Sequence, residues 1–268
     1  MAVRASWTGT LGFGLVSIQV GTTPAVREND VAYKQFREVT DEGTGEVSLN
    51  PVGRQNVDKV TEDVVQYGDI VRGYEASNGA IVKVNDAELD ALAPESGKHI
   101  EIAKFVDLED VFGDDLFFAK HEYVFPKKGG EKAYALMVKA LATTGKGGLG
   151  QTVRRGKAQS ILIRAYKGVM VLTFLHWDDE VRTPEYIDVL PVEVNEAESN
   201  MAVALIQAMA GDWKPAELID THREAAIKLL EAKAEGVEPA AAPAPKQQPV
   251  TDLMAALQAS VEASKKNK

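Results

Sequence analysis

The sequence predicts a mixed, mainly β fold: a first part rich in strands and typical of a barrel, followed by C-terminal helices and a flexible tail. Val16, Ile18 and Val20 alternate with polar residues, a pattern typical of a strand with one buried face. Glycines 9, 12 and 14 interrupt this opening region, which indicates a bulge or a close backbone approach, as in a barrel of sharply bent strands. From Glu196 onward the apolar period becomes that of helices.

Composition limits the class of protein. The 268 residues are 45% hydrophobic and contain no cysteine, which excludes a disulfide scaffold, a Cys-ligated metal site and a thiol nucleophile. No apolar run approaches the roughly 18 residues of a membrane span, and the N-terminus lacks the apolar stretch of a signal peptide. The sequence therefore predicts a soluble intracellular protein that does not enter a membrane.

The charge of the chain is unevenly distributed. The net charge is −10, yet residues 117–176 contain eleven basic and only two acidic side chains. Such a block within an acidic protein indicates a local surface for a polyanion. Neutralisation of the acidic flanks within the fold is the alternative that charge alone leaves open.

Local patterns place the elements in order. Asn78-Gly79, between Tyr74 and Val82, predicts a two-residue hairpin turn, and Asn85 begins a short helix that ends near Leu92. In the basic segment we expect a strand over 117–125, a loop over 126–130, and a helix. The apolar stripe of that helix comprises Ala133, Leu136, Met137, Ala140 and Leu141. Strands over 151–154, 160–165 and 169–176 follow, with basic residues at their turns.

The C-terminal region predicts two helices and a tethered third. The first carries Met201 and Leu205, and the second runs from about Leu218 to Gly236, with a break between them at 211–215. Residues 237–250 are rich in Pro and Ala and form a linker. A last helix over 251–268 is predicted to dock on a partner, with a folded-back helix or a solubilising tail as alternatives. Its apolar stripe comprises Leu253, Met254, Leu257 and Val261.

No catalytic or metal constellation is recognisable. The glycines of 145–150 match G-x-G-x-x-G but follow a helix and precede a strand, the reverse of the order that dinucleotide binding requires. The four histidines are dispersed, without metal-ligand spacing. Asp178, Asp179 and Glu180 could bind Mg²⁺, but a solvated acidic face is the preferred interpretation. We expect no catalytic residue, no metal and no cofactor.

Several motifs in order resemble the prokaryotic Ku family, the DNA-end-binding factors of non-homologous end joining. The opening segment Arg4-x-x-Trp7-x-Gly9-x-Leu11-x-Phe13-Gly14 is similar to the first strand of that family. Further matches are Val71-Arg-Gly-Tyr74-Glu75, Ile100-Glu-Ile-x-x-Phe105-Val106, Gly129-Gly-Glu-Lys-Ala-Tyr-Ala-Leu136, Leu175-His-x-Asp-Asp179-Glu180 and Asp220-Thr221-x-Arg223-Glu224. The tail from Thr251 to Lys266 extends the resemblance nearly end to end.

The resemblance implies a Ku-type β-barrel core with arm-like loops. Two copies would form a homodimeric ring that is threaded by a broken DNA duplex without sequence preference. It divides the chain into a barrel core over 1–195, with the DNA-encircling segment 117–176, and a helical arm over 196–236. The linker 237–250 and a helix over 251–268 that engages an ATP-dependent DNA ligase of the end-joining pathway would follow. Together with the charge block, it predicts DNA-backbone contacts from Lys127, Lys128, Lys132, Lys146, Arg154, Arg155, Lys157, Arg164 and Lys167.

Three departures from the family pattern limit what is carried over. Many bacterial relatives have a C-x-x-C near the region aligned with 51–57, which this chain lacks; His222 replaces a common Tyr; and the tail is short and barely basic. A bacterial cytoplasmic protein is expected, and a bacteriophage-encoded copy is also compatible. A Mg²⁺-dependent nucleic-acid-processing enzyme and a scaffold for an acidic protein partner remain the alternative functions.

Overall fold

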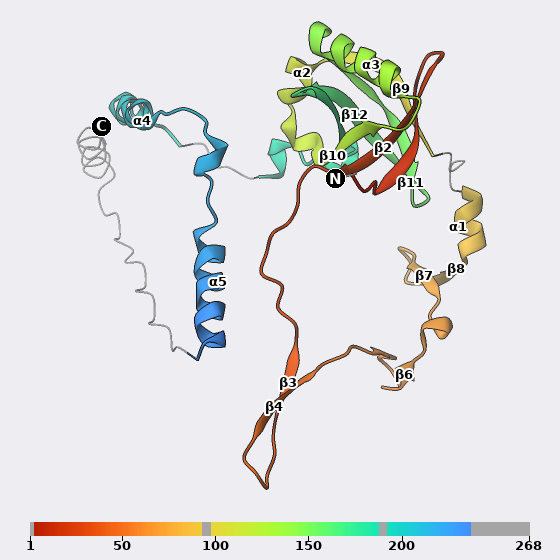
Figure 1. Cartoon of the computed structure of the whole chain (residues 1–268), viewed down its shortest axis with the longest axis vertical. Coiled ribbons are helices and arrows are strands. Elements are labelled where there is room, and N and C mark those ends of the chain that lie inside the picture. The colour runs from red at the N-terminus through yellow and green to blue at the C-terminus, as the bar shows by residue number, and fades with distance from the viewer. Residues whose placement is uncertain (1–2, 93–97, 188–191, 237–268) are drawn as a thin grey trace. The chain divides into compact units, whose positions relative to one another are not determined.

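The computed structural model describes residues 3–92, 98–187 and 192–236 (Figure 1). It divides into two compact units. The first comprises Met1–Glu28 and Lys34–Pro184, and the second comprises Asn29–Tyr33 and Glu185–Lys268. The predicted linker and the predicted tail helix with its apolar stripe lie outside the described residues.

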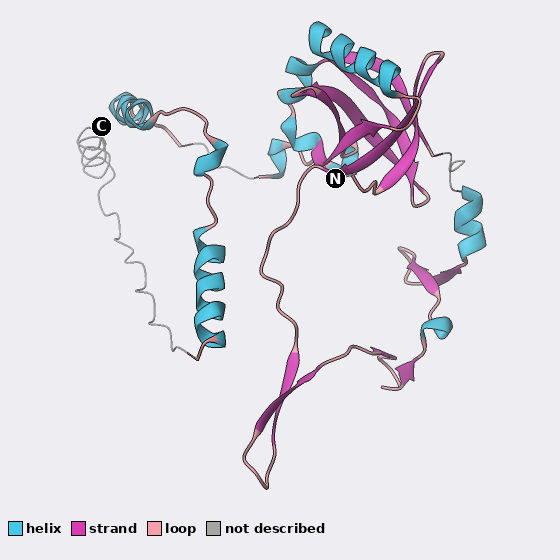
Figure 2. Ribbon diagram, viewed as in Figure 1, coloured by secondary structure: helices cyan, strands magenta, loops and turns pink. Residues whose placement is uncertain are grey.

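The first unit contains a closed barrel of seven strands, which confirms the mainly β prediction. In barrel order the strands are β1 (Trp7–Phe13), β2 (Val16–Pro24), β10 (Phe118–Pro126), β13 (Val169–Leu175), β12 (Lys157–Tyr166), β11 (Lys146–Arg154) and β9 (His99–Asp107). All neighbouring strands are antiparallel except β1 and β9, which are parallel and close the barrel. The magenta strands of Figure 2 show this closed arrangement.

The barrel core comes from alternate residues of each strand. Leu11 of β1 pairs with Ile18 of β2 and with Ile100 of β9, and all three are fully buried. Ile161 and Ile163 of β12 belong to the same core cluster, whereas the buried Leu162 between them does not. This period of two is the pattern that predicted strands, because successive side chains point to opposite faces.

Glycines permit close approaches between strands. A Cβ on Gly9 would collide with the carbonyl oxygen of Lys98, so the close backbone approach predicted for the opening strand is present. Gly14 has a φ of +56° in the turn between β1 and β2, whose pairing is regular. The irregular registers lie elsewhere, between Phe118 and Lys120 and between Leu149 and Gly150.

Helix α3 (Glu131–Thr144) packs against one end of the barrel. Its Tyr134 hydroxyl donates a hydrogen bond of 2.7 Å to the Val124 carbonyl and accepts one of 2.9 Å from the Met170 amide. The predicted stripe is therefore partly wrong: Tyr134, Met137 and Leu141 are buried, while Leu136 is 69% exposed. Anchoring of the tyrosine ring by two strands rotates the buried face of the helix.

A long segment, residues 25–98, connects β2 to β9, and we call it the arm. It contains three two-stranded ladders: β3 (Phe36–Thr40) with β4 (Val47–Pro51), β5 (Asn56–Val57) with β6 (Val64–Val65), and β7 (Arg72–Glu75) with β8 (Ile81–Val84). The helix α1 (Asp86–Leu92) follows, and Asn85 caps it as predicted. The hairpin at Asn78-Gly79 is present, but five residues, 76–80, connect its strands instead of two.

Short helices complete the first unit. The five-residue α2 (Leu108–Phe112) follows β9, and 3₁₀ turns lie at Tyr67–Asp69, Asp115–Phe117 and Asp178–Glu180. A fourth, Pro184–Tyr186, includes the boundary between the units, and a fifth, Pro215–Glu217, belongs to the second unit. Leu108 packs on the outer face of the barrel, where a Cβ on Gly147 would meet both Leu108 and Leu162.

The second unit contains helices α4 (Glu196–Met209) and α5 (Thr221–Ala234). Asn195 caps α4 in a capping box with Glu198, and Asp220 caps α5 by accepting a hydrogen bond from the Arg223 amide. Leu218 therefore precedes the helix that was predicted to contain it. Neither helix buries a residue. Among the described residues, no helix has the length and apolar character needed to cross a membrane.

Candidate nucleic-acid interface

The basic segment, residues 117–176, forms β10, α3, β11, β12 and β13. Three of its eleven cations are ion-paired: Lys120 and Arg154 with Glu122, and Lys146 with Asp107. The other eight have no ion pair with any described residue, and they leave the surface of this segment strongly positive. They are Lys127, Lys128, Lys132, Lys139, Arg155, Lys157, Arg164 and Lys167.

Arg154, one of the predicted DNA contacts, points into the barrel. Its guanidinium donates a hydrogen bond of 2.8 Å to Glu122, which is 2% exposed, and lies over the rings of Trp7 and Phe174 at 4.6 Å and 4.9 Å. Its Nε is buried without a hydrogen-bond partner. Arg154 therefore forms an ion pair inside the barrel, with the buried carboxylate of Glu122.

Glu122 is the acidic centre of this buried site. Burial by itself raises the pKa of Glu122, but hydrogen bonds from Thr22, Arg154 and Lys120 and the charge of Arg154 outweigh burial. The pKa of Glu122 is consequently lower than that of an ordinary glutamate. The carboxylate stays ionised, so Arg154 and Lys120 keep a counter-charge at neutral pH.

The remaining predicted contacts, except Arg164, are divided between the two ends of the barrel. Arg155 and Lys157 lie where β11 pairs with the start of β12, and Lys167 lies where β12 pairs with the start of β13. The ten residues of β12 between these two places span about 30 Å. These basic residues therefore do not form the one continuous patch that the sequence suggested.

The hairpin end, which we define by Arg155 and Lys157, is also where the arm joins the barrel. Arg155 and Gly156 have φ of +54° and +74° and form the tight turn, so both cations are presented at an exposed tip. The arm begins after Pro24, which pairs with Glu122, and ends before His99, which is next to Ile100, the β9 residue that pairs with Thr152. Both junctions belong to this end of the barrel.

The opposite end, which we call the α3 end, has the larger number of lysines. Pro126 pairs with Val20, which places the loop after β10 next to the start of α3. Of the lysines here, Lys127 lies 5.2 Å from the Phe125 ring, and Lys146 is held at 2.7 Å by Asp107. The predicted contacts of this end are Lys127, Lys128, Lys132, Lys146 and Lys167.

Arg164 lies on the outer face of β12 and is half-buried. Its guanidinium lies between the rings of Phe112 and Tyr166, at 5.3 Å and 5.2 Å. Burial lowers the pKa of Arg164, and burial together with the charge of Arg164 lowers the pKa of His121. This cation is held rigidly by aromatic side chains and has no carboxylate partner among the described residues.

Lys139 is a cation of this segment that the sequence reasoning did not select as a contact. It lies two helical turns after Lys132 on α3, is exposed, and lines a pocket beside the β12–β13 turn. The sequence did contain a signal for it: Lys139 follows Lys132 by seven residues, and residues with this spacing share one face of a helix.

The described residues hold no group of three or more His, Cys, Asp or Glu side chains that could bind a metal ion. Asp178, Asp179 and Glu180 form a 3₁₀ turn, in which Glu180 accepts a hydrogen bond from the Trp177 amide. This bond lowers the pKa of Glu180. Residues 145–150 comprise Gly145, the C-cap of α3, and the start of β11.

Comparison with known proteins points to one family. Residues 12–210 match the model of the Ku70/Ku80 beta-barrel domain. The chain is 34% identical to the non-homologous end joining protein Ku of Archaeoglobus fulgidus, over 98% of this chain and 100% of that protein. It is 32% identical to that of Mycobacterium tuberculosis, over 98% of this chain and 97% of that protein.

Other relatives are longer. The chain is 37% identical to the Ku protein of Frankia casuarinae over 98% of its own length, but it spans only 64% of that relative and of the one from Symbiobacterium thermophilum. The similarity nevertheless covers nearly the whole chain and agrees with the closed barrel. The chain belongs to the Ku family of non-homologous end joining proteins.

Proposed function

We propose that this chain forms a non-enzymatic, ring-shaped homodimer that binds the ends of double-stranded DNA without sequence preference. In this proposal it recruits and stimulates an ATP-dependent DNA ligase in double-strand break repair. It would act in the bacterial cytoplasm, at the nucleoid. The observation that carries the proposal is an arm that leaves and rejoins the barrel at one end, beside cations that have no carboxylate partner in the described part of the chain.

The arm supports a dimer because it cannot stabilise itself. No described residue of 25–92 is buried, and isolated two-stranded ladders are marginally stable in water. Large apolar side chains of the ladders are exposed, among them Phe36, Leu49, Tyr74 and Ile81. Exposed apolar area of this extent calls for a second surface, and a second copy of the chain supplies one.

The charges support binding to a DNA backbone. Arg155 and Lys157 are the leading contacts, because they are exposed, unpaired among the described residues and adjacent to both junctions of the arm. Lys127, Lys128, Lys132, Arg164 and Lys167 form a second group. Lys146 and Arg154 already have carboxylate partners, so their removal should affect the barrel more than DNA binding. Contacts to phosphates alone would make binding independent of sequence.

The decisive experiment compares one short duplex in linear form and as a covalently closed circle, at several salt concentrations. A ring that must be threaded predicts binding to the linear form alone. Equal binding to the linear and the circular DNA would show that the protein contacts DNA from the side, and it would refute the proposed ring. Binding to neither would favour the alternative of a scaffold for an acidic protein.

The ligase role is tested separately through the tail. Deletion of residues 251–268 should leave DNA binding unchanged and abolish stimulation of the ligase, since an amphipathic helix gains its stability in the groove of a partner. Replacement of Leu253 and Leu257 by Ser in the intact chain is the matched variant that keeps the tail length. Full stimulation by both variants would refute the docking role.

A further inference from the structure

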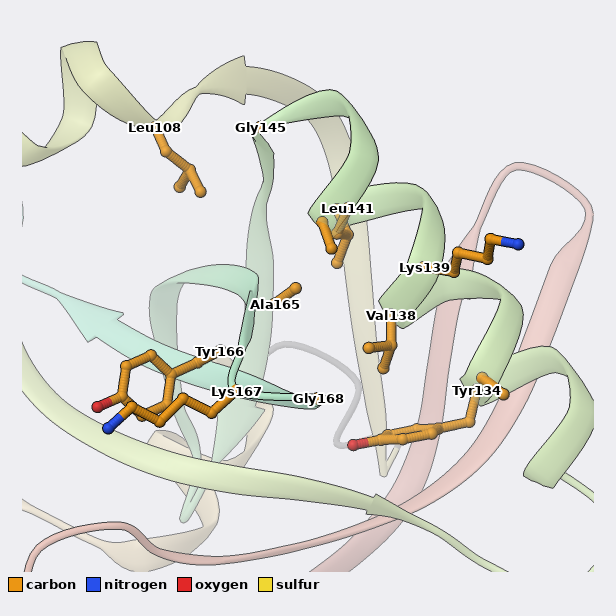
Figure 3. Close-up of a pocket in the computed structure, with 12 residues that line it drawn as sticks. Leu108, Tyr134, Val138, Lys139, Leu141, Gly145, Ala165, Tyr166, Lys167 and Gly168 are labelled. Atoms are coloured by element: carbon orange, nitrogen blue, oxygen red, sulfur yellow. The ribbon is translucent and has the colours of Figure 1, made fainter.

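A pocket of about 530 Å³ lies at the α3 end of the barrel, between α3 and the β12–β13 turn (Figure 3). Its wall is mainly apolar and includes Tyr134, Val138, Leu141 and Ala165. The Tyr134 hydroxyl is held by two backbone hydrogen bonds, so the ring is fixed in place. A volume of this size is in the range of sites that accept several apolar groups of a ligand.

The charged side chains that line this pocket have one sign. Its lining includes Lys139 and Lys167, and it includes no Asp or Glu. Figure 3 shows the two lysines on opposite sides of the pocket, with their ammonium groups directed outward from its rim. Lys167 Nζ lies 5.2 Å from the Tyr166 ring, and neither lysine has an ion pair with a described residue. An apolar wall beside two lysines that have no ion pair with a described residue favours a ligand with both apolar and acidic groups.

A peptide segment fits this chemistry better than a DNA backbone. A phosphate would gain from the lysines but nothing from the apolar wall, whereas an amphipathic helix places apolar anchors one turn apart and carboxylates beside them. The pocket also lies about 30 Å along β12 from the junctions of the arm. The two ends of the barrel therefore differ in chemistry as well as in position.

We propose that the α3 end is a docking site for an acidic amphipathic segment of a partner protein. Apolar anchors of the segment occupy the pocket between Tyr134 and Ala165, and its carboxylates pair with Lys139 and Lys167. This goes beyond the DNA-binding proposal, from which it reassigns Lys167 alone, and it is independent of the tail. The docking site and the DNA-binding ring can therefore fail separately.

The test uses the full chain and a fluorescein-labelled twelve-residue peptide with Leu at positions 3, 6, 7 and 10 and Glu at both ends. The variant Lys139→Glu/Lys167→Glu should weaken binding at least about tenfold, because two attractive contacts become repulsive. Lys127→Glu/Lys128→Glu is the matched control: it makes the same charge change at the same barrel end, at residues that do not line the pocket.

Two further measurements separate the pocket from general attraction. A peptide with Ser in place of every Leu should bind at least about tenfold more weakly, since burial of apolar side chains supplies its affinity. Because the chain has no cysteine, Ala142→Cys can be alkylated specifically with a bulky maleimide and should then block the peptide. Ala140→Cys, exposed on the same helix but outside the pocket, should have no effect when alkylated.

Three outcomes would overturn the proposal. They are absence of peptide binding, equal weakening by the two lysine double variants, and equal affinity of the Leu and Ser peptides. Binding of a 20-base-pair duplex provides the comparison: loss of duplex affinity in Lys139→Glu/Lys167→Glu, with peptide affinity unchanged, would assign these lysines to DNA. Thermal unfolding of each variant checks the fold, and all the substituted side chains are on the surface.

Discussion

Replacement of Arg154 by Met tests whether this cation supports the barrel or binds DNA. The substitution removes the 2.8 Å hydrogen bond to Glu122 and leaves a buried carboxylate with one fewer partner. Breaking a buried ion pair from one side costs about 3–5 kcal/mol. Since Lys120 Nζ remains at 3.0 Å from Glu122, we expect the lower value, about 3 kcal/mol.

The assay is urea and thermal unfolding of the intact chain, followed by tryptophan fluorescence. For a unit of this size, a loss of about 3 kcal/mol lowers the melting temperature by about 6–12 °C. Arg155→Met, at the exposed turn next to it, should change the free energy of unfolding by no more than about 0.5 kcal/mol. Glu122→Leu/Arg154→Met, which removes both charges, should recover most of the loss.

Salt-dependent DNA binding of the same variants completes the test. Below its melting temperature, Arg154→Met should keep the dependence of log Kd on log salt of the unchanged protein. An Arg154→Met protein that unfolds normally but has a reduced salt slope would refute the reasoning, because its guanidinium would then contact phosphate instead of Glu122.

Three further predictions concern DNA contacts, pH and packing. Arg155→Ala/Lys157→Ala should reduce the slope of log Kd against log salt by roughly 0.9 for each phosphate that is no longer neutralised. It should also weaken binding to all DNA sequences alike. A larger reduction of the slope in Lys127→Ala/Lys128→Ala would show that the leading contacts lie at the α3 end. The pKa of Glu122 is lowered in the fold, so its contribution to stability is present above the ordinary glutamate pKa and is lost as pH falls through the folded value. Unfolding of Glu122→Gln across acidic pH should lack that loss, and identical pH profiles would contradict it. Gly150→Ala should destabilise the barrel by about 3 kcal/mol or more, because its Cβ would collide with the Glu101 carbonyl. A Cβ on Gly156 would meet no atom, so the loss of stability in Gly156→Ala should be only the strain of its positive φ. Equal unfolding midpoints of the two variants would show that the backbone relaxes around the alanine at position 150.

The sequence predicted the strands well where burial follows local alternation. Val16, Ile18 and Val20 were expected to share a buried face; Ile18 and Val20 are in the core, whereas Val16, next to the turn, is 42% exposed. It predicted α3 but not its buried face, because Tyr134 is fixed by Val124 and Met170, and the latter is 36 residues away in the chain. Local periodicity contains no information about such a distant partner.

The candidate interface shows the same limit. Arg154, Arg155 and Lys157 are neighbours in sequence and resemble one basic tip, yet strand alternation turns Arg154 inward and the turn presents Arg155. What holds Arg154 is Glu122, 32 residues away, together with Thr22, 132 residues away. Charge counting identified the basic segment, but only the fold shows that three of its cations have carboxylate partners and that Arg154 is largely buried.

The way the barrel closes has a consequence for how this architecture can diversify. In the barrel, β1 alone separates β2, where the arm begins, from β9, where it ends. The arm is therefore one long connection between two nearly adjacent strands. Lengthening such a connection changes the stability little, because doubling its length adds only about 0.6 kcal/mol of loop-closure entropy. Insertions and deletions in 25–98 would leave all seven strand pairings intact. Evolution could thus resize the arm while the barrel stays constant.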